Sequence, residues 1–256
     1  MNSIKTFRLD GRAALVTGSS RGIGRAIALG LAECGAVVAV HGSKPAKALD
    51  ETLAEVRKLS PRSVAVTGDL SQSEVPARIV AEATAALGAL DILVVNASIQ
   101  IRKPWAEVTQ AAAEQQMQVN FHATLRMIQA AVPAMRAKKW GRILTVGSVQ
   151  QQRPHPDMVV YAASKSAQEN LVRNLAKQVG PDGITINNLA PGVILTDRNV
   201  PALSDDAYAA RVREIIPLRF FGESEDCVGA ALLLCSDAGR YITGVDLLVD
   251  GGMALP

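Results

Sequence analysis

The chain has few aromatic residues and few cysteines, and each scarcity excludes something. Aromatic side chains make up 4% of the 256 residues while 48% are hydrophobic, so the core must be built from Ala, Val, Leu and Ile. The three cysteines are Cys34, Cys227 and Cys235. Their number is odd and no two form a CxxC pair, which argues against a disulfide framework and against a zinc site. We therefore expect reduced thiols and no bound metal.

Long apolar runs and blocks of like charge are also missing. No window approaches the roughly 18 apolar residues of a transmembrane helix, and the polar stretch 2–6 offers no apolar signal segment. The formal net charge is +3, with basic and acidic residues interspersed, which is too weak a bias to predict nucleic-acid binding. The composition thus predicts a cytoplasmic protein that acts on a small molecule, without membrane or nucleic-acid partners.

Short apolar runs alternate with longer segments of helical periodicity along the whole chain. The short runs are apolar on both faces, which is typical of strands buried in a parallel sheet. Strands are predicted at 13–17, 37–40, 64–67, 92–95, 143–146, 184–189 and 246–249. Helices are predicted at 23–34, 46–59, 75–87, 107–136, 159–179 and 224–235. This order predicts an α/β fold of one domain, 1–256, with a doubly wound, open, parallel seven-stranded sheet of the Rossmann type and helices on both faces.

A glycine-rich turn follows the first predicted strand and opens the first helix. Residues 17–24 read TGSSRGIG, so the glycines are spaced GxxxGxG rather than GxGxxG. Free N–H groups at a helix start attract phosphate, and glycines let the backbone approach it without an intervening Cβ. The place of this turn between strand and helix favours a dinucleotide pyrophosphate site over a purely structural turn.

The end of the second strand indicates which dinucleotide binds. An acidic residue there would bind the 2′-hydroxyl of NAD and repel the 2′-phosphate of NADP. The chain instead reads Val40-His41-Gly42-Ser43-Lys44, and Arg21 supplies a further cation. NADP(H) is therefore favoured, with NAD(H) as the alternative. Asp69, after the third strand, could either accept a hydrogen bond from the adenine amino group or cap the following helix, a role for which Ser71 competes.

A tyrosine and a lysine are the strongest catalytic candidates. Residues 161–165 read YAASK, which places a phenol and an ammonium at i and i+4 on one helix face. A cation about 4 Å from the phenol, at an effective dielectric of about 20, favours the phenolate by about 4 kcal/mol. Tyr161 could then exchange a proton with a substrate alcohol near neutral pH, while Ser148 bonds the substrate oxygen. A YxxxK pair often occurs by chance, so the prediction depends on its combination with the glycine turn and Ser148.

Together these motifs resemble the short-chain dehydrogenase/reductase family over essentially the whole chain. The matching residues are TGSSRGIG at 17–24, Asp69, Asn96-Ala97, Asn120, Ser148, YAASK at 161–165, Pro191-Gly192 with Thr196, IPLRFFGESED at 216–226 and ITGVDLLVDGG at 242–252. The resemblance implies that Tyr161 is the general acid/base, that Lys165 binds the nicotinamide ribose and lowers the phenol pKa, and that Ser148 orients the substrate. It also implies that Asn120 holds a water in a proton relay, that Thr196 contacts the nicotinamide carboxamide, and that the chain forms a homotetramer.

The motifs and the resemblance together define the predicted site. The catalytic residues are Asn120, Ser148, Tyr161 and Lys165. The cofactor-binding residues are Gly18, Ser20, Arg21, Gly22, Ile23, Gly24, Ser43, Lys44, Asp69, Leu70, Asn96, Ala97, Tyr161, Lys165, Pro191, Gly192 and Thr196. One position departs from the family pattern Asn-Asn-Ala-Gly, because this chain reads Val95-Asn96-Ala97-Ser98. Ser98 adds a Cβ where glycine lets the backbone run close to the nicotinamide ribose.

The substrate is predicted from the loops after the fourth and fifth strands. Arg102, Ser148 and Gln150 are the candidate substrate residues, since a guanidinium pairs with carboxylates and an amide binds hydroxyls. Both loops resemble those of gluconate 5-dehydrogenases and related sugar-acid reductases, which favours a sugar acid or polyol. The alternatives are a 3-oxoacyl thioester of acyl-carrier protein and, in another class, a nucleotide-binding regulator without turnover. The irregular stretch 196–221 is predicted to be a lid over the substrate.

Overall fold

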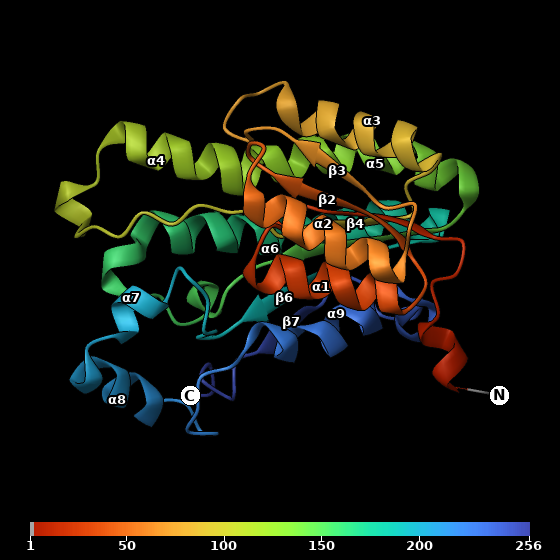
Figure 1. The fold of residues 1–256 in the computed structure, drawn as a ribbon. Helices are drawn as coiled ribbons and strands as arrows, with labels where there is room; N and C mark the ends of the chain where they lie inside the picture. Colours follow the sequence, from red (N-terminus) through yellow and green to blue (C-terminus); the bar gives the residue numbers. More distant parts are fainter. Residues whose placement is uncertain (1–2) are drawn as a thin grey trace.

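Seven parallel strands form a single sheet in the computed structural model, which describes residues 3–256; Met1 and Asn2, at the start of the polar N-terminal stretch, lie outside them. The strand order is β3-β2-β1-β4-β5-β6-β7 (Figure 1). The strands are β1 (Ala13–Val16), β2 (Val37–Gly42), β3 (Val64–Thr67), β4 (Ile92–Val95), β5 (Gly141–Val146), β6 (Ile184–Pro191) and β7 (Asp246–Val249). The chain winds outward from β1 to β3 and then crosses to β4, so the predicted doubly wound parallel sheet is confirmed.

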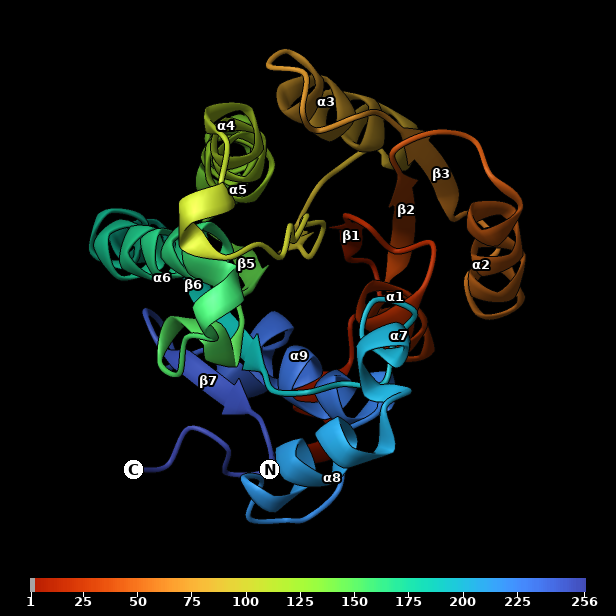
Figure 2. The same cartoon turned by 90° about the vertical axis from the view of Figure 1, so that its left-hand side faces the viewer.

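Helices cover both faces of this sheet, as Figure 2 shows in a view onto the ends of the strands. The helices are α1 (Gly22–Glu33), α2 (Lys47–Leu59), α3 (Val75–Leu87), α4 (Gln110–Met117), α5 (Ala123–Lys138), α6 (Val159–Val179), α7 (Val200–Leu203), α8 (Asp206–Glu214) and α9 (Val228–Cys235). Helices α1, α2 and α9 share one apolar core with the sheet, and α3, α5 and α6 share the other. Because both faces are covered, the central strands are apolar on each side, as their sequence predicts. No helix in residues 3–256 is long and apolar enough to cross a bilayer.

The predicted helix 107–136 differs most from the structure. A 3-10 turn occupies Trp105–Glu107, and α4 begins only at Gln110, where the Thr109 hydroxyl caps the free backbone N–H groups. Between α4 and α5 the chain forms a π-helical turn, Gln118–His122. Such a turn widens the helix without interrupting its polar and apolar periodicity, so the sequence pattern does not reveal it.

Candidate active site

A large cleft opens where the strands end, at the crossover between β1 and β4. Its volume is about 1210 Å³, above the roughly 300–1,000 Å³ typical of a pocket for a drug-sized ligand. Parallel strands deliver the loops that follow them to the same edge of the sheet, which is where an open α/β sheet binds its ligands. The space is sufficient for a dinucleotide together with a small substrate.

Nearly all predicted site residues line this one cleft. From the cofactor set these are Gly18, Ser20, Arg21, Gly22, Ile23, Gly24, Ser43, Asp69, Leu70, Asn96, Ala97, Tyr161, Pro191, Gly192 and Thr196, and from the substrate set Arg102, Ser148 and Gln150. Lys44 does not line it and is exposed, because the chain turns outward between Gly42 and the start of α2. Lys165 and Asn120 lie buried behind the cleft wall.

The glycine turn forms a cradle whose backbone is fixed by its neighbours. Gly18 has a left-handed conformation, with φ of +62°, and a Cβ there would lie 2.8 Å from the Cα of Ala97. The Asn96 side-chain Nδ2 donates to the carbonyl oxygens of Thr17 (2.9 Å) and Gly18 (3.0 Å). At the start of α1 no side chain caps the free N–H groups, although Arg21 occupies the N-cap position. These N–H groups are therefore available to an anion, which fits a dinucleotide pyrophosphate.

Asn96 thus holds the glycine turn in place, and the side chain of Asp69 likewise bonds to backbone close to it in sequence. Asp69 Oδ1 accepts a hydrogen bond from the backbone N–H of Ser71 at 2.9 Å. This contact closes a turn after β3 and does not cap the following helix, since Glu74 occupies the N-cap position of α3 and no side chain of the described residues caps it. Asp69 and Leu70 both line the cleft, so the contact of Asp69 with adenine stays a prediction.

Sequence reasoning did not single out His41, which lies under the glycine turn. Its side chain is 2% exposed. Its Nδ1 accepts from the N–H of Gly18 (3.1 Å), and its Nε2 donates to the carbonyl oxygen of Gly68 (3.0 Å), so both ring nitrogens are used. Burial lowers the pKa of His41, the Gly68 hydrogen bond raises it, and the charge of Arg78 lowers it further. The neutral imidazole is therefore the native form, and a protonated Nδ1 would lose the bond to Gly18.

Acidification is expected to destabilise the protein through this histidine. An unfolded histidine takes up its proton as the pH falls through about 6.5, whereas the native pKa of His41 lies lower. The free energy of unfolding should therefore be constant above that pH and fall as the pH drops towards the native pKa. Urea titrations at pH 7.5 and 5.0 test this. The His41→Asn variant should lose much of the difference, while the control His155→Asn, a ring that is less buried, should keep most of it; an equal slope in all three proteins contradicts the assignment.

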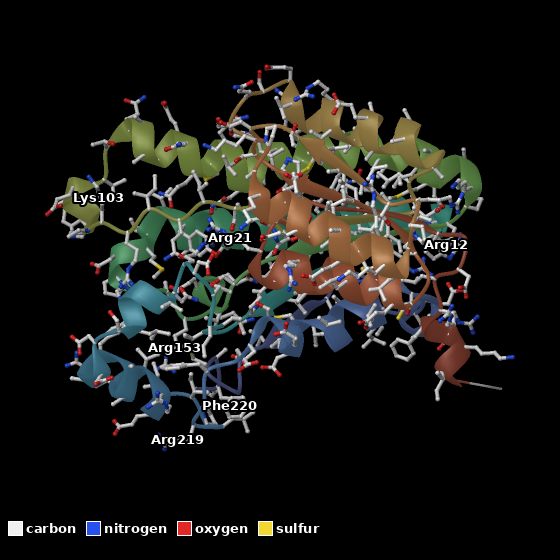
Figure 3. All side chains as sticks on the ribbon, in the orientation of Figure 1. Arg12, Arg21, Lys103, Arg153, Arg219 and Phe220 are labelled. Carbon is white, nitrogen blue, oxygen red and sulfur yellow. The ribbon has the colours of Figure 1, made fainter. Side chains whose placement is uncertain are left out.

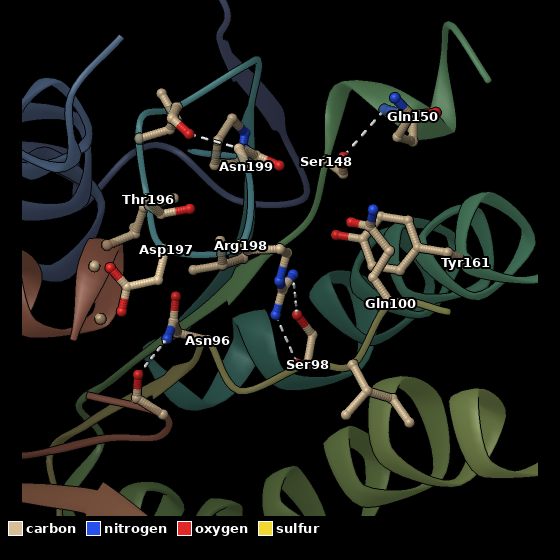
Figure 4. A pocket seen from close by; sticks show the side chains of 18 of the residues that line it. Asn96, Ser98, Gln100, Ser148, Gln150, Tyr161, Thr196, Asp197, Arg198 and Asn199 are labelled. Atoms are coloured by element: carbon tan, nitrogen blue, oxygen red, sulfur yellow. Dashed lines mark hydrogen bonds between the residues drawn. The ribbon is translucent and has the colours of Figure 1, made fainter. Parts of the chain in front are cut away.

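Tyr161 and Ser148 line the other half of the cleft from two structural elements, and Lys165 lies buried near the Tyr161 ring on the same helix. Tyr161 and Lys165 come from the first turns of α6, and Ser148 caps the 3-10 turn Val149–Gln151 after β5. The Ser148 hydroxyl accepts from the backbone N–H of Gln150 at 3.2 Å, which leaves its own hydrogen free to donate into the cleft. The Lys165 Nζ lies 5.8 Å from the centre of the Tyr161 ring. Figure 4 shows Tyr161 and Ser148 facing the same space.

Lys165 is the most unusual charged group of the site. It is 2% exposed, and its Nζ donates to the carbonyl oxygen of Val146 (2.7 Å) and to Gln168 Oε1 (3.2 Å). Burial, and secondarily the positive charge of Arg198, lower its pKa to about 7. Near neutral pH this side chain can therefore gain or lose a proton, whereas an exposed lysine would remain charged.

Asn120 lies in the π-helical turn and connects two walls of the site. Its side chain accepts from the N–H of Ile99 (2.9 Å) and donates to the Ile99 carbonyl (2.9 Å) and to Ser164 Oγ (3.0 Å). All of its side-chain hydrogen-bonding groups thus have partners within the protein. The side chain ties the loop after β4 to α6, the helix of Tyr161 and Lys165, and π turns are frequent at such functional positions.

The segment after β6 reaches back across the cleft. The Arg198 guanidinium donates to Ser98 Oγ (3.2 Å) and to the Ser98 carbonyl (2.8 Å), as Figure 4 shows. Arg21, whose side chain lies beside the start of α1 in Figure 3, contacts Asp197 at 3.2 Å. Both partners of that ion pair are more than 70% exposed, so it contributes little stability. Ser98, the position that departs from the family pattern, is therefore an anchor for the predicted lid, and sequence reasoning had missed Arg198.

The predicted substrate residues lie at the outer end of the cleft. The Arg102 guanidinium is exposed and lies 3.4 Å from His155 Nε2. Gln150 Oε1 accepts from the backbone N–H of His155 at 2.6 Å, so its amide is oriented by the loop that carries it. Within residues 3–256 no group of three His, Cys, Asp or Glu side chains is placed to hold a metal ion.

A parallel sheet with a glycine cradle and a Tyr-Lys helix on one cleft is the architecture of a dinucleotide-dependent oxidoreductase. A family model described as "Enoyl-(Acyl carrier protein) reductase" matches residues 18–254. The chain belongs to the short-chain dehydrogenase/reductase family, as its motifs indicate, and is a dehydrogenase/reductase rather than a regulator without turnover.

Three relatives illustrate the similarity. The L-rhamnose 1-dehydrogenase (NAD(P)(+)) of Sphingomonas sp. (strain SKA58) is 35% identical over 249 residues, which cover 96% of this chain and 97% of the relative. The solved 3-oxoacyl (acyl-carrier-protein) reductase of Agrobacterium tumefaciens C58, with NADP bound, is 39% identical, with a TM-score of 0.92 and coverage of 98% and 97%. The gluconate 5-dehydrogenase of Burkholderia cenocepacia J2315, in complex with NADP and tartrate, is 32% identical, with a TM-score of 0.92 and full coverage of both chains.

Proposed function

We propose that this enzyme interconverts a carbonyl group and a secondary alcohol on a sugar acid or polyol, with NADP(H) as its preferred cofactor. The observation that carries the proposal is the convergence of Tyr161, Ser148 and the glycine cradle on one cleft. The cationic and amide side chains of Arg102 and Gln150 at its outer end support a polar, carboxylate-bearing substrate. Two of the relatives above are named for sugar or sugar-acid substrates, which agrees with this class.

The chemistry follows from the positions of the three side chains. The bound nicotinamide supplies or accepts the hydride. In the reductive direction Tyr161 donates its phenolic proton to the substrate oxygen, and in the oxidative direction it takes the proton back. Ser148 donates a hydrogen bond to the same oxygen and stabilises the charge that develops there. Lys165, whose Nζ lies 5.8 Å from the centre of the Tyr161 ring, would supply a positive charge that favours the phenolate and, by the family resemblance, would bind the nicotinamide ribose.

The cradle would hold the pyrophosphate, and the end of β2 would meet the adenosine ribose. Ser43 lines the cleft there and no acidic residue follows β2, so a 2′-phosphate meets no repulsion. The exposed segment 196–221, which contains α7 and α8, would close over the substrate as a lid. Figure 3 shows Arg219 and Phe220 of this segment projecting outward beyond α8, and Phe220 is 54% exposed.

Cofactor choice gives a direct test. NADPH is expected to bind more tightly than NADH, and Ser43→Asp should shift the ratio of the two dissociation constants towards NADH by about tenfold or more, because the new carboxylate repels the 2′-phosphate. Fluorescence titration of the reduced cofactors measures both constants. Ser73→Asp makes the same chemical change on an exposed loop outside the cleft and should leave the ratio unaltered. Equal or tighter binding of NADH by the unmodified enzyme would reject the preference.

Arg102 is expected to bind the carboxylate of the substrate. Arg102→Ala should raise KM for a sugar acid by roughly 10- to 100-fold, the value of a lost charge-assisted hydrogen bond, with kcat nearly constant. Lys103→Ala removes the adjacent exposed cation, which does not line the cleft, and serves as the control. An unchanged KM in Arg102→Ala, or an equal rise in both variants, argues against this role.

A 3-oxoacyl thioester is the second candidate substrate. The similarity to a 3-oxoacyl (acyl-carrier-protein) reductase at 39% identity favours it. A screen of keto-sugar acids, polyols and acetoacetyl thioesters with both cofactors separates the two classes. Turnover of the thioester alone would replace the sugar-acid assignment and leave the proposed roles of Tyr161 and Ser148 intact.

We also propose a homotetramer that acts in the cytoplasm. The edge strand β7 leaves one row of backbone groups unpaired within the monomer, and all its residues are partly exposed, which suits pairing with a second copy. The cysteines of the described chain are free thiols, which agrees with a reducing compartment. Light scattering coupled to size-exclusion chromatography measures the oligomeric state, and a monomeric mass would reject the assembly.

A further inference from the structure

A chain of buried side-chain amides runs from Lys165 to the edge strand β7. Lys165 Nζ donates to Gln168 Oε1 (3.2 Å), Gln168 Nε2 donates to Asn188 Oδ1 (3.4 Å), and Asn188 Nδ2 donates to Asp246 Oδ1 (2.7 Å). Every hydrogen bond has its donor on the lysine side. This series of hydrogen bonds therefore begins at an ammonium group and ends at a carboxylate, with two oriented amide dipoles between them.

These amides lie where a protein core is normally apolar. Gln168 is 1% exposed and Asn188 is 0% exposed. Burial of such groups costs free energy unless their hydrogen bonds are made, and a partly satisfied network is worse than an apolar core. Here Gln168 donates to Asn188, Asn188 donates to Asp246 and Gln151, and Gln168 provides one of the two acceptors of Lys165. Their placement is thus suited to a buried cation.

Asn188 also connects this chain to the serine of the site. Its Nδ2 donates to Gln151 Oε1 (3.4 Å), and the same oxygen accepts from the backbone N–H of Ser148 (3.2 Å). Thr145 Oγ1 donates to Asn188 Oδ1 at 2.6 Å and fixes the orientation of its amide. One buried amide therefore has hydrogen-bonded routes to both Lys165 and Ser148.

We propose that Gln168 is a positioning residue that holds the ammonium form of Lys165 behind Tyr161, with Asn188 and Asp246 completing a directed hydrogen-bond chain. The inference rests on the proposed function only for the role of Lys165 in turnover. The titratable and charged groups near Lys165 or its amide network include Tyr161 on α6, Arg198 after β6 and Asp246 on β7, which is reached through the two amides. Glu169 on α6 also joins this network, because it accepts from Gln151 Nε2. The positive charge of Arg198 disfavours the ammonium form of Lys165, and the hydrogen-bonded amides favour it.

Two substitutions at Gln168 are expected to act in opposite directions. Gln168→Leu keeps the approximate size and removes the acceptor, so the ammonium loses a partner and the pKa of Lys165 falls. Gln168→Glu places a carboxylate beside the ammonium, so the pKa rises; a shift of roughly one unit either way is expected for a group at this distance. If the substitutions acted only by loosening the packing, the pKa of Lys165 would shift in the same direction in both variants.

NMR titration of the full-length protein labelled with [ε-13C]lysine reads the Lys165 pKa directly, and Lys165→Arg identifies its signal. Asp246→Asn, at the partly exposed end of the chain, gives a smaller downward shift and is available if Gln168→Leu does not fold. Gln178→Leu is the control, because Gln178 lies exposed on the same helix and its side chain hydrogen-bonds Asn174, outside the Lys165 network. Unchanged titration in both Gln168 variants, or shifts of the same sign, would overturn the proposal.

Turnover provides the second readout. In Gln168→Leu, kcat for NADPH oxidation with the substrate found by the screen should fall about tenfold with KM nearly constant, and the pH–rate profile should move with the Lys165 titration. A kcat equal to that of the unmodified enzyme overturns the positioning role. If the unmodified enzyme turns over no compound in the screen, the proposed function fails, while the NMR titration still decides whether Gln168 holds the ammonium.

Discussion

Replacing Tyr161 by phenylalanine is expected to lower kcat by roughly two to four orders of magnitude, the usual contribution of a positioned general acid/base. The substitution removes one hydroxyl from a ring that is 5% exposed, so the fold and the cofactor cradle should be preserved. The dissociation constant of NADPH should therefore change by less than about threefold, within the range of a surface perturbation. Stopped-flow turnover and fluorescence titration measure the two effects separately.

Tyr241→Phe is the matched control, since Tyr241 is fully exposed and does not line the cleft. Its kcat should stay close to that of the unmodified enzyme. Near-normal turnover by Tyr161→Phe would remove the proposed mechanism entirely. A large loss of NADPH affinity would show instead that the phenol acts mainly in binding.

The second large effect is expected at Gly24, in the first turn of α1. A Cβ at this position would lie 2.5 Å from the carbonyl oxygen of Gly18 and closer still to Asn96 Nδ2, the pair whose hydrogen bond closes the cradle. Gly24→Ala must therefore force the glycine turn away from the loop after β4. We expect NADPH affinity to fall at least about 100-fold, since about 2.7 kcal/mol of binding suffices for that loss, and the unfolding free energy to fall by about 1–3 kcal/mol from overpacking.

Gly229→Ala on α9 separates the local clash from the general effect of alanine in a helix. Apart from its chain neighbours and the backbone of its own helix, no atom of residues 3–256 lies within 4 Å of a Cβ built there, so this variant should be neutral or gain up to about 1 kcal/mol from helix propensity. Isothermal titration with NADPH and urea unfolding give both quantities for each protein. Unimpaired binding by Gly24→Ala would place the dinucleotide away from the cradle.

The sheet was predictable because each of its strands is marked locally. Val94, for example, is fully buried between two helical layers, and its β-branched neighbours on both faces signal this in the sequence. The ends of elements were less predictable: β6 continues to Pro191 rather than ending at Leu189, since pairing with β7 extends it. The predicted helix 107–136 was wrong at its start, and the π turn within it was not foreseen, because a capping threonine and a π turn leave no trace in hydrophobic periodicity.

The candidate site divides in the same way. Tyr161, Lys165 and Ser148 could be proposed from the sequence because short motifs fix their spacing within one element or at one strand end. Arg198, His41 and Gln168 were missed, since each acts on a partner that is distant in sequence or ordinary in type. Lys44 was predicted from its distance along the chain after β2, and the outward turn before α2 removes it from the cleft.

The amino-acid sequence by itself determined the order of strands and helices, the glycine turn and the tyrosine–lysine spacing, since these depend on backbone geometry within a few residues. Tertiary structure alone decided which polar groups share a dry interior: Asn188 lies 23 residues beyond Lys165 in sequence, yet one glutamine joins them. Hydrogen bonds and desolvation act over a few ångströms of space, and parallel strands bring together residues from far along the chain. The charge state of Lys165 is therefore a property of the folded protein.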